Sequence, residues 1–337
     1  MASYQRLGAS DLVPQKATLF KACWPCRRET GVWNCCGQRY TLRNYWVYNI
    51  LASILHLANA VLMIVLFYIP DEDGETQKDV CYQLHMAYGS WQRPDNSSLA
   101  PEPDQPFEIV TKYMDTSQLS LHWLIVGFHL LSFFFQIIVI FLDRQSPCRI
   151  NLCGRISYPY QDLVERSGVN PLRFIEYSVS ASIMLICIAL LTGIYDENTL
   201  IGIGTLCAAC QFFGLIGELT PNVAVRGFAH FAGWLTLMVS YGIIWIYYGV
   251  ANYQGGLLEP PRSAPDIVHI VVIGLFVLFN FFGVVQLTQF CCKGDNCWYR
   301  WIGAEAELSY VMGSLISKTL LGWLIYAQVL VMASPCK

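Results

Sequence analysis

Charged residues are scarce in this chain. Asp, Glu, Lys and Arg make up only 13% of its 337 residues, whereas soluble domains carry about 25%. Hydrophobic residues make up 55%, and the mean hydropathy is +0.41. This composition excludes an ordinary soluble domain, and no nucleic-acid partner is expected. The sequence also has no strong internal repeat and no low-complexity tract.

Long apolar segments are plentiful instead. Each is about 20 residues or more, which is enough to cross a bilayer as a helix that satisfies its own backbone polar groups. The first begins too late and is too long to be a signal peptide. We therefore predict an all-α membrane protein with seven transmembrane helices, in the ranges 45–69, 118–142, 172–195, 198–218, 227–250, 266–290 and 308–332. The domains expected are a Cys-rich N-terminal extension at 1–44, the bundle at 45–333 and a tail at 334–337.

The lysines and arginines are distributed unevenly across the predicted membrane. Fifteen of the 21 fall in segments on the same side as the N-terminus, and five fall on the other side. The positive-inside rule then predicts a cytoplasmic N-terminus and an extracellular C-terminus. The loop 70–117 would lie outside, where Asn96-Ser97-Ser98 forms an N-glycosylation sequon. An unused sequon is the alternative.

The cysteines also divide by side. Most lie on the predicted inner side, including Cys23, Cys26, Cys35 and Cys36. A four-thiolate zinc site, palmitoylation close to the membrane and plain reduced thiols are all compatible with that pattern.

Three further cysteines, Cys187, Cys207 and Cys210, fall inside helices and are expected to be packing residues. Only Cys81 and Cys336 lie on the predicted outer side, where disulfides persist. No spacing argument decides whether these two form a bond with each other.

One lysine, Lys318, lies inside a predicted span, about ten residues into the last one. An ammonium near the middle of a bilayer is costly, so such a residue is by default functional. A buried lysine can form a Schiff base with an aldehyde. Glu176, at the start of the third span, is a second costly charge. Together they indicate a retinal protein, in which the lysine holds retinal and the carboxylate neutralises the protonated Schiff base.

Two segments resemble one protein family. Arg173–Ser182, with the sequence RFIEYSVSAS, resembles the third-helix signature of the heliorhodopsins. Ser314–Lys318, with the sequence SLISK, resembles their retinal-lysine segment. The inverted topology and the long first outer loop are similar as well. The resemblance covers about residues 45–333 and implies a seven-helix, rhodopsin-like light sensor with retinal as cofactor.

The resemblance also implies roles for individual residues. Lys318 would carry retinal and Glu176 would be its only counterion, because Ser314 stands where proton-pumping rhodopsins have a second aspartate. Polar or chromophore-contacting positions would be Ser180, Met184, Tyr241, Phe279, Asn280 and Trp323, with tryptophan common in relatives at the position of Tyr241. A polar cavity for the proton, on the cytoplasmic side of the Schiff base, would involve His56, His129, Arg173, Glu218 and Glu307.

The residues themselves support part of this assignment. His56 and His129 each lie about ten residues into a span, the depth estimated for Lys318, which suggests a shared cavity. Two unrelated buried histidines, each satisfied by its own hydrogen bonds, are the alternative. Glu218 and Glu307 lie near predicted inner helix ends, where hydrated charges at the membrane surface are the alternative.

The expected function is photochemical and not enzymatic. A proton pump needs a second carboxylate to return the proton, and pumps place it eleven residues after the counterion. That position is Cys187 here, so no active pumping is expected. A light-gated proton or ion channel, or a transporter, is the alternative. The expected partners are membrane lipid, a second copy in a homodimer and an unknown cytoplasmic signalling protein.

Overall fold

Seven membrane-length helices form most of the computed structural model. It describes residues 33–35, 38–40, 45–69, 81–92, 108–144, 150–152, 156–158, 160, 164, 169–220, 222–257, 266–291 and 306–327. The helices are α2 (Tyr45–Tyr68), α3 (Leu121–Arg144), α5 (Pro171–Leu191), α6 (Glu197–Leu219), α7 (Val223–Gly256), α8 (Asp266–Cys291) and α10 (Ala306–Ile325). Each coincides with a predicted apolar segment, so the prediction of a seven-helix bundle is confirmed.

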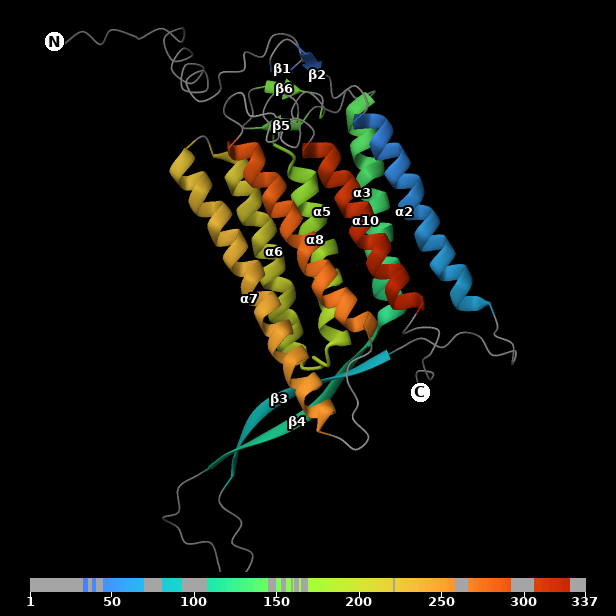
Figure 1. Ribbon diagram of the computed structural model, residues 1–337, viewed down its shortest axis with the longest axis vertical. Coiled ribbons are helices and arrows are strands. Elements are labelled where there is room, and N and C mark those ends of the chain that lie inside the picture. The colour runs from blue at the N-terminus through green and yellow to red at the C-terminus, as the bar shows by residue number, and fades with distance from the viewer. Residues whose placement is uncertain are drawn as a thin grey trace, which may run out of the picture.

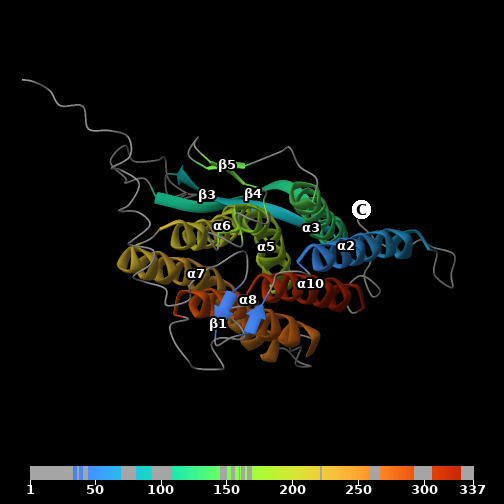
Figure 2. The ribbon, with the colours of Figure 1, turned by 90° about the horizontal axis from the view of Figure 1, so that it is seen from above.

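The helices lie side by side (Figure 1), and their contacts close into a ring. Going round the ring, the order is α2, α3, α5, α6, α7, α8 and α10, and α10 also packs against α2. α5 is the most buried of the seven, because it also contacts α8 across the ring. Seen from above, α8 lies between α7 and α10 (Figure 2). This position of α8 matters for the cavity described below.

Large apolar side chains remain exposed on the outer faces of the helices. They include Leu51 on α2, Phe141 on α3, Phe228 and Phe231 on α7 and Val277 on α8. So much exposed apolar surface is unfavourable in water, whereas it is favourable in contact with the hydrocarbon chains of lipid. The chain is therefore an integral, multi-pass membrane protein.

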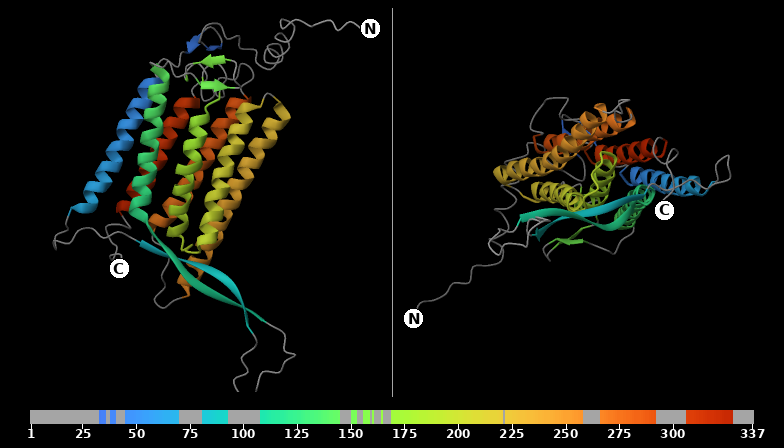
Figure 3. Two further views of the ribbon diagram at one scale, coloured as in Figure 1. Left: turned by 180° about the vertical axis from the view of Figure 1, so that it is seen from behind. Right: turned by 90° about the horizontal axis from the view of Figure 1, so that it is seen from below.

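A twisted β-hairpin is the one large element that the sequence did not predict. Strands β3 (Cys81–Gln92) and β4 (Glu108–Ser120) pair antiparallel, and β4 continues directly into α3. Gln118–Ser120, which we had assigned to the second span, therefore belong to a strand. The hairpin crosses one end of the bundle (Figure 3). We call that end the hairpin end, and the opposite end, where α2 begins, the Tyr45 end.

The hairpin is attached to the turn between α5 and α6. The backbone N–H of His85 donates to the carbonyl of Tyr195 at 3.1 Å, and that of Ala87 donates to Oδ1 of Asp196 at 3.4 Å. Tyr82 stacks on Tyr195 with 5.3 Å between ring centroids.

Asp196 also caps α6 by accepting from the backbone N–H of Thr199 at 2.8 Å. In the same turn, Gly193 adopts a φ of +88°, which ends α5 four residues earlier than predicted. The turn between α5 and α6 thus ends α5, begins α6 and anchors the hairpin.

Two short strand pairs lie at the Tyr45 end, β1 (Trp33–Cys35) with β2 (Gln38–Tyr40) and β5 (Ile150–Leu152) with β6 (Ile156–Tyr158). Asn96, Cys23, Cys26, Cys36 and Cys336 fall outside the described residues, so the sequon and the inner cysteines stay predictions. Cys81 is disulfide-bonded. Cys187, Cys207 and Cys210 are free and pack inside the bundle, as expected.

Candidate functional site

The amine of Lys318 is buried and surrounded by three oxygen atoms. Its Nζ lies 2.6 Å from Oε1 of Glu176, 2.5 Å from Oγ of Ser132 and 2.9 Å from Oγ of Ser314. The whole lysine is only 2% exposed. All three donor positions of an ammonium group are thus matched by acceptors.

Three helices bring these groups together. Ser314 lies four residues before Lys318 on α10, so the two side chains share one face of that helix. Glu176 comes from the first turns of α5, and Ser132 comes from the middle of α3. The Ser132 hydroxyl also lies 2.6 Å from Oε1 of Glu176, so it contacts both members of the ion pair.

Sequence reasoning missed Ser132. It is a single polar residue in the apolar run Leu130-Leu131-Ser132-Phe133, and its partners lie 44 and 186 residues away. Ser180, expected at a polar or chromophore-contacting position, has a buried hydroxyl without a hydrogen-bond partner among the described residues.

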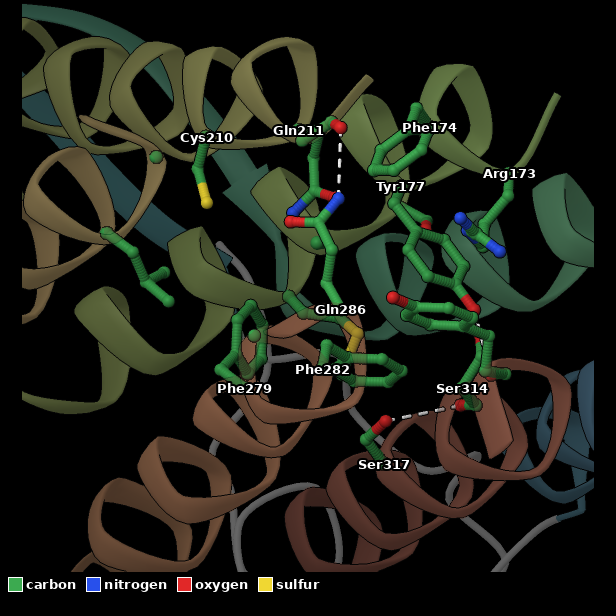
Figure 4. Close-up of a pocket in the computed structure, with 18 of the residues that line it drawn as sticks. Arg173, Phe174, Tyr177, Cys210, Gln211, Phe279, Phe282, Gln286, Ser314 and Ser317 are labelled. Atoms are coloured by element: carbon green, nitrogen blue, oxygen red, sulfur yellow. Dashed lines mark hydrogen bonds between the residues drawn. The ribbon is translucent and has the colours of Figure 1, made fainter. Parts of the chain in front are cut away.

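A cavity opens beside Lys318 and crosses the bundle interior (Figure 4). Its lining comes from α5, α6, α7, α8 and α10 and includes Tyr177, Met184, Trp234, Leu237, Phe279 and Phe282. A mostly apolar cavity with a buried primary amine at one end fits a long apolar aldehyde such as retinal.

The predicted chromophore contacts divide into two groups. Met184, Phe279, Ser180 and Ser314 line the cavity. Tyr241 is buried behind it and packs edge-on against Phe279, with 5.8 Å between ring centroids.

Trp323 and Asn280 are not among the cavity-lining residues. Trp323 is five residues after Lys318, so its side chain points about 140° away from that of Lys318 around the axis of α10. Its indole N–H donates to Oδ1 of Asn59 on α2 at 2.8 Å. Asn280, one position after Phe279, donates to the carbonyl of Phe276 within its own helix.

His56 and His129 contact each other, as their matching depths suggested. Their Nδ1 atoms lie 3.0 Å apart, and both residues are fully buried. The structure places the pair on the hairpin side of Lys318. His129 comes one turn before Ser132 on α3 and so lies nearer the hairpin end. Its Nε2 lies beside Gly322, where an added Cβ would be 3.3 Å away. Gly322 is one turn beyond Lys318 on α10, also toward the hairpin end.

Glu176 lies on the opposite side of Lys318, toward the Tyr45 end. With the N-terminus inside, the histidine pair is therefore on the outer side of the amine. The expected cytoplasmic placement of the pair and the expected N-in topology cannot both hold.

A second buried charge cluster lies toward the Tyr45 end. The guanidinium of Arg173 forms ion pairs with both Glu218 and Glu307 and stacks over the ring of Tyr310 at 3.8 Å. Asn170 supports both carboxylates, donating its side-chain N–H to Glu307 at 2.8 Å and its backbone N–H to Glu218 at 3.2 Å. Both glutamates are buried, so the alternative of hydrated surface charges is wrong.

A smaller, more polar cavity lies between the two charge sites. Its lining includes Glu176, Glu307, Asn49 and Gln136. The side-chain oxygen of Gln136 is buried and has no partner among the described residues. Polar cavities with such groups are where buried waters bind.

Comparison with known proteins agrees with this geometry. No curated protein sequence matches the chain. Solved structures with a similar fold include a rhodopsin from Exiguobacterium sibiricum, with 13% identity, 86% of this chain and 98% of that chain covered, and a TM-score of 0.51. Another is xanthorhodopsin, described as a light-driven ion pump with a dual chromophore, at 11% identity, 85% and 91% coverage and 0.51.

A thermophilic rhodopsin has 11% identity, 84% and 93% coverage and a TM-score of 0.50. At such identities these likenesses concern the fold alone. The model of one family, heliorhodopsin, matches residues 45–330, which is most of the chain. The chain therefore belongs to the heliorhodopsin family, a family of membrane rhodopsins, and its cofactor is retinal.

Proposed function

We propose that this protein is a light sensor that carries retinal as a protonated Schiff base on Lys318, with Glu176 as the counterion. The observation that carries the proposal is the contact of 2.6 Å between Nζ of Lys318 and Oε1 of Glu176, beside the cavity. Bound there, retinal supplies light absorption and photoisomerisation. The chain supplies the attachment point, the opposite charge and the shape of the cavity.

The surroundings of Nζ favour a charged nitrogen. Glu176 supplies a negative charge, while Ser132 and Ser314 supply neutral acceptors. In a site that excludes water, such fixed groups stabilise a positive charge far better than they would in solvent. Among the described residues, Glu176 is the only carboxylate in contact with Nζ, which supports a single counterion.

The distribution of carboxylates supports a sensor over a pump. Within the described residues, the buried carboxylates are Glu176, Glu218 and Glu307, and all three lie on the Tyr45 side of Lys318. Cys187, at the position where pumps keep a proton donor, is fully buried among apolar residues. A pump would need a group on the far side to return the proton, and among the described residues no buried carboxylate lies there.

The orientation is part of the proposal. We place the Tyr45 end in the cytoplasm, because basic residues concentrate in the segments on that side. The hairpin end, with Asn96 in its loop, then faces outward. A tag at the N-terminus that antibodies reach in intact cells would contradict this orientation, and so would glycosylation of the N-terminal segment.

Reconstitution with retinal is the central experiment. Full-length protein in lipid vesicles should develop a visible absorption band when retinal is added, and flashes should drive a reversible photocycle. Illumination at zero voltage should produce no sustained pH change that a protonophore abolishes. A sustained change of that kind would show that the protein pumps protons.

The alternative function is a light-gated channel. The histidine pair on one side of Lys318 and the polar cavity on the other are what favour it, because together they place polar groups along the bundle axis. A light-induced current that is absent at zero voltage and reverses with the applied voltage would support the channel. Its absence, together with a complete photocycle, would support the sensor. Homodimerisation and a cytoplasmic signalling partner remain further parts of the proposal.

A further inference from the structure

The cavity contains two buried polar atoms that an ordinary retinal would leave unpaired. Nε1 of Trp234 and Nε2 of His230 have no hydrogen-bond partner among the described residues, and both side chains line the cavity. Both residues belong to α7, whereas Lys318 belongs to α10, and α8 lies between those two helices (Figure 2). The two side chains thus belong to the α7 wall of the cavity, and Lys318 belongs to the α10 wall.

The hydrogen bonds around His230 determine which of its nitrogens carries the proton. Nε2 of Gln286 donates to the carbonyl of Gly214 at 2.9 Å, so the amide oxygen of Gln286 is the atom that faces His230. That oxygen lies 3.1 Å from Nδ1 of His230, and an oxygen can only accept. In the tautomer that satisfies this contact, Nδ1 holds the hydrogen and Nε2 is the acceptor.

Trp234 supplies the complementary group, because an indole N–H can only donate. It lies four residues after His230 on the same face of α7, with 5.6 Å between the two ring centroids. Its Nε1 packs against Gly283, where a Cβ would come within 2.3 Å of that nitrogen. Only glycine at this position leaves room for the indole against α8.

One donor and one acceptor side by side match one chemical group, a hydroxyl. We propose that the cavity selects a retinal whose ring carries a hydroxyl group, which accepts from Trp234 and donates to His230. This inference rests on the proposed attachment of retinal to Lys318 and names the class of retinoid. A ketone in the same place could accept from Trp234 but could not donate to His230. An unsubstituted ring leaves both buried atoms unsatisfied.

The test is a competition for the full-length protein. Equal amounts of all-trans-retinal and a ring-hydroxylated retinal are offered, the bound retinoid is released with hydroxylamine, and its identity is measured by chromatography. We expect the hydroxylated form to be taken in at least about tenfold preference, since each unsatisfied buried group weakens binding by about that factor. A ring-ketone retinal, offered in the same way, should compete less well than the hydroxylated form.

Two variants and one control separate the pair from the rest of the cavity. Trp234→Phe removes the donor and His230→Phe removes the acceptor, and each should lower the preference below that of the unchanged protein, because only one of the two hydrogen bonds remains. Trp245→Phe changes an indole on the same helix that packs against Phe276 outside the cavity lining, so the preference should persist.

Equal uptake of the two aldehydes by the unchanged protein would overturn this inference and leave the proposed function standing. So would a preference that is undiminished in both variants, because the pair would then not be its source. If neither aldehyde gives a visible band, the proposed function fails, and this inference fails with it.

Discussion

Lys318 and Glu176 lie 142 residues apart in the sequence, yet their charged atoms meet at 2.6 Å in the interior of the bundle. The pair joins α10 to α5, and both side chains are almost completely shielded from solvent. Removing one member of a buried pair leaves the other charge uncompensated, at a cost of about 3–5 kcal/mol. Substitutions at these two positions should therefore affect both the pigment and the stability of the protein.

Lys318→Ala should abolish covalent retinal binding and the visible colour, because Lys318 is the only lysine inside a described span. The measurement is the absorption spectrum after retinal is added, followed by acid denaturation to detect a covalent adduct. Lys112→Ala, on the exposed strand β4, is the control and should bind retinal normally. A coloured, acid-stable pigment in Lys318→Ala would refute the attachment site.

Glu176→Gln should shift the visible band to longer wavelength, or the imine should lose its proton at a pH more than about one unit lower. The physical reason is that the negative charge nearest to Nζ is removed. Absorption spectra and a pH titration of the reconstituted pigment measure both effects. Asp266→Asn, at the exposed start of α8, should change neither. An unchanged spectrum and titration in Glu176→Gln would exclude it as the main counterion.

Ser132→Ala should produce a smaller spectral change than Glu176→Gln, because it removes hydrogen bonds and leaves both charges in place. The lost bonds should also lower the free energy of unfolding by about 1 kcal/mol. Ser178→Ala is a matched control, since the Ser178 hydroxyl only bonds to the carbonyl of Ile175 in its own helix. A spectral change in Ser132→Ala no larger than that in Ser178→Ala would mean that Ser132 does not act on the ion pair.

Arg173→Met should destabilise the bundle strongly, by about 3–5 kcal/mol, because Glu218 and Glu307 would stay buried without a counter-charge. Thermal unfolding in lipid nanodiscs would measure the loss. Adding Glu218→Gln and Glu307→Gln to the same chain should recover much of it. Arg226→Met, which loses a bond to a carbonyl and no ion pair among the described residues, should have a smaller effect. An equal effect in both arginine variants would contradict this reasoning.

Asp196 should make the attachment of the hairpin dependent on pH. Partial burial acts in the opposite direction, but hydrogen bonds from Thr199 and Ala87 and the nearby His85 lower the pKa of Asp196 below its ordinary value of 3.8. Its contribution to stability is thus fully present above pH 3.8 and is lost as the pH falls through the lowered pKa. The protection of the His85 and Ala87 amides against hydrogen exchange, relative to their intrinsic exchange rates at each pH, should fall over that range.

Two substitutions of Asp196 separate its cap from its charge. Asp196→Ala removes the cap of α6 and should cost about 0.5–2 kcal/mol, whereas Asp196→Asn keeps a capping oxygen and should cost less. Protection of the His85 and Ala87 amides that stays constant over that pH range in the unaltered protein would contradict the role of the carboxylate.

The sequence predicted the spans well and the interior contacts unevenly. Length and hydropathy are sufficient for helix existence, because a bilayer imposes both. The hairpin was missed because β4 does not alternate between a buried and an exposed face. Ile109, Val110, Tyr113 and Met114 are all exposed, so no period of two marks the strand.

Within the site, Lys318 and Glu176 were identifiable because a charge in a span is costly wherever it points. The membrane cost of a charge does not mark the neutral side chains Ser132, Trp234 and His230. Whether they face the site depends on how α3 and α7 are rotated about their axes. That rotation is set by tertiary packing, which a single sequence does not show. Trp323 was expected at the cavity for the same reason, but the rotation of α10 directs its side chain toward α2.

Helices α5 and α10 are joined by two buried ion pairs, Glu176 with Lys318 and Arg173 with Glu307. Along α10 the two partners are eleven residues apart, about 16 Å, so the attachments lie at two different depths. α10 cannot tilt or slide against α5 without separating charges at one depth or the other, and each separation is costly. The two helices therefore form a rigid frame, and a change of shape after light absorption has to be taken up by the helices around it.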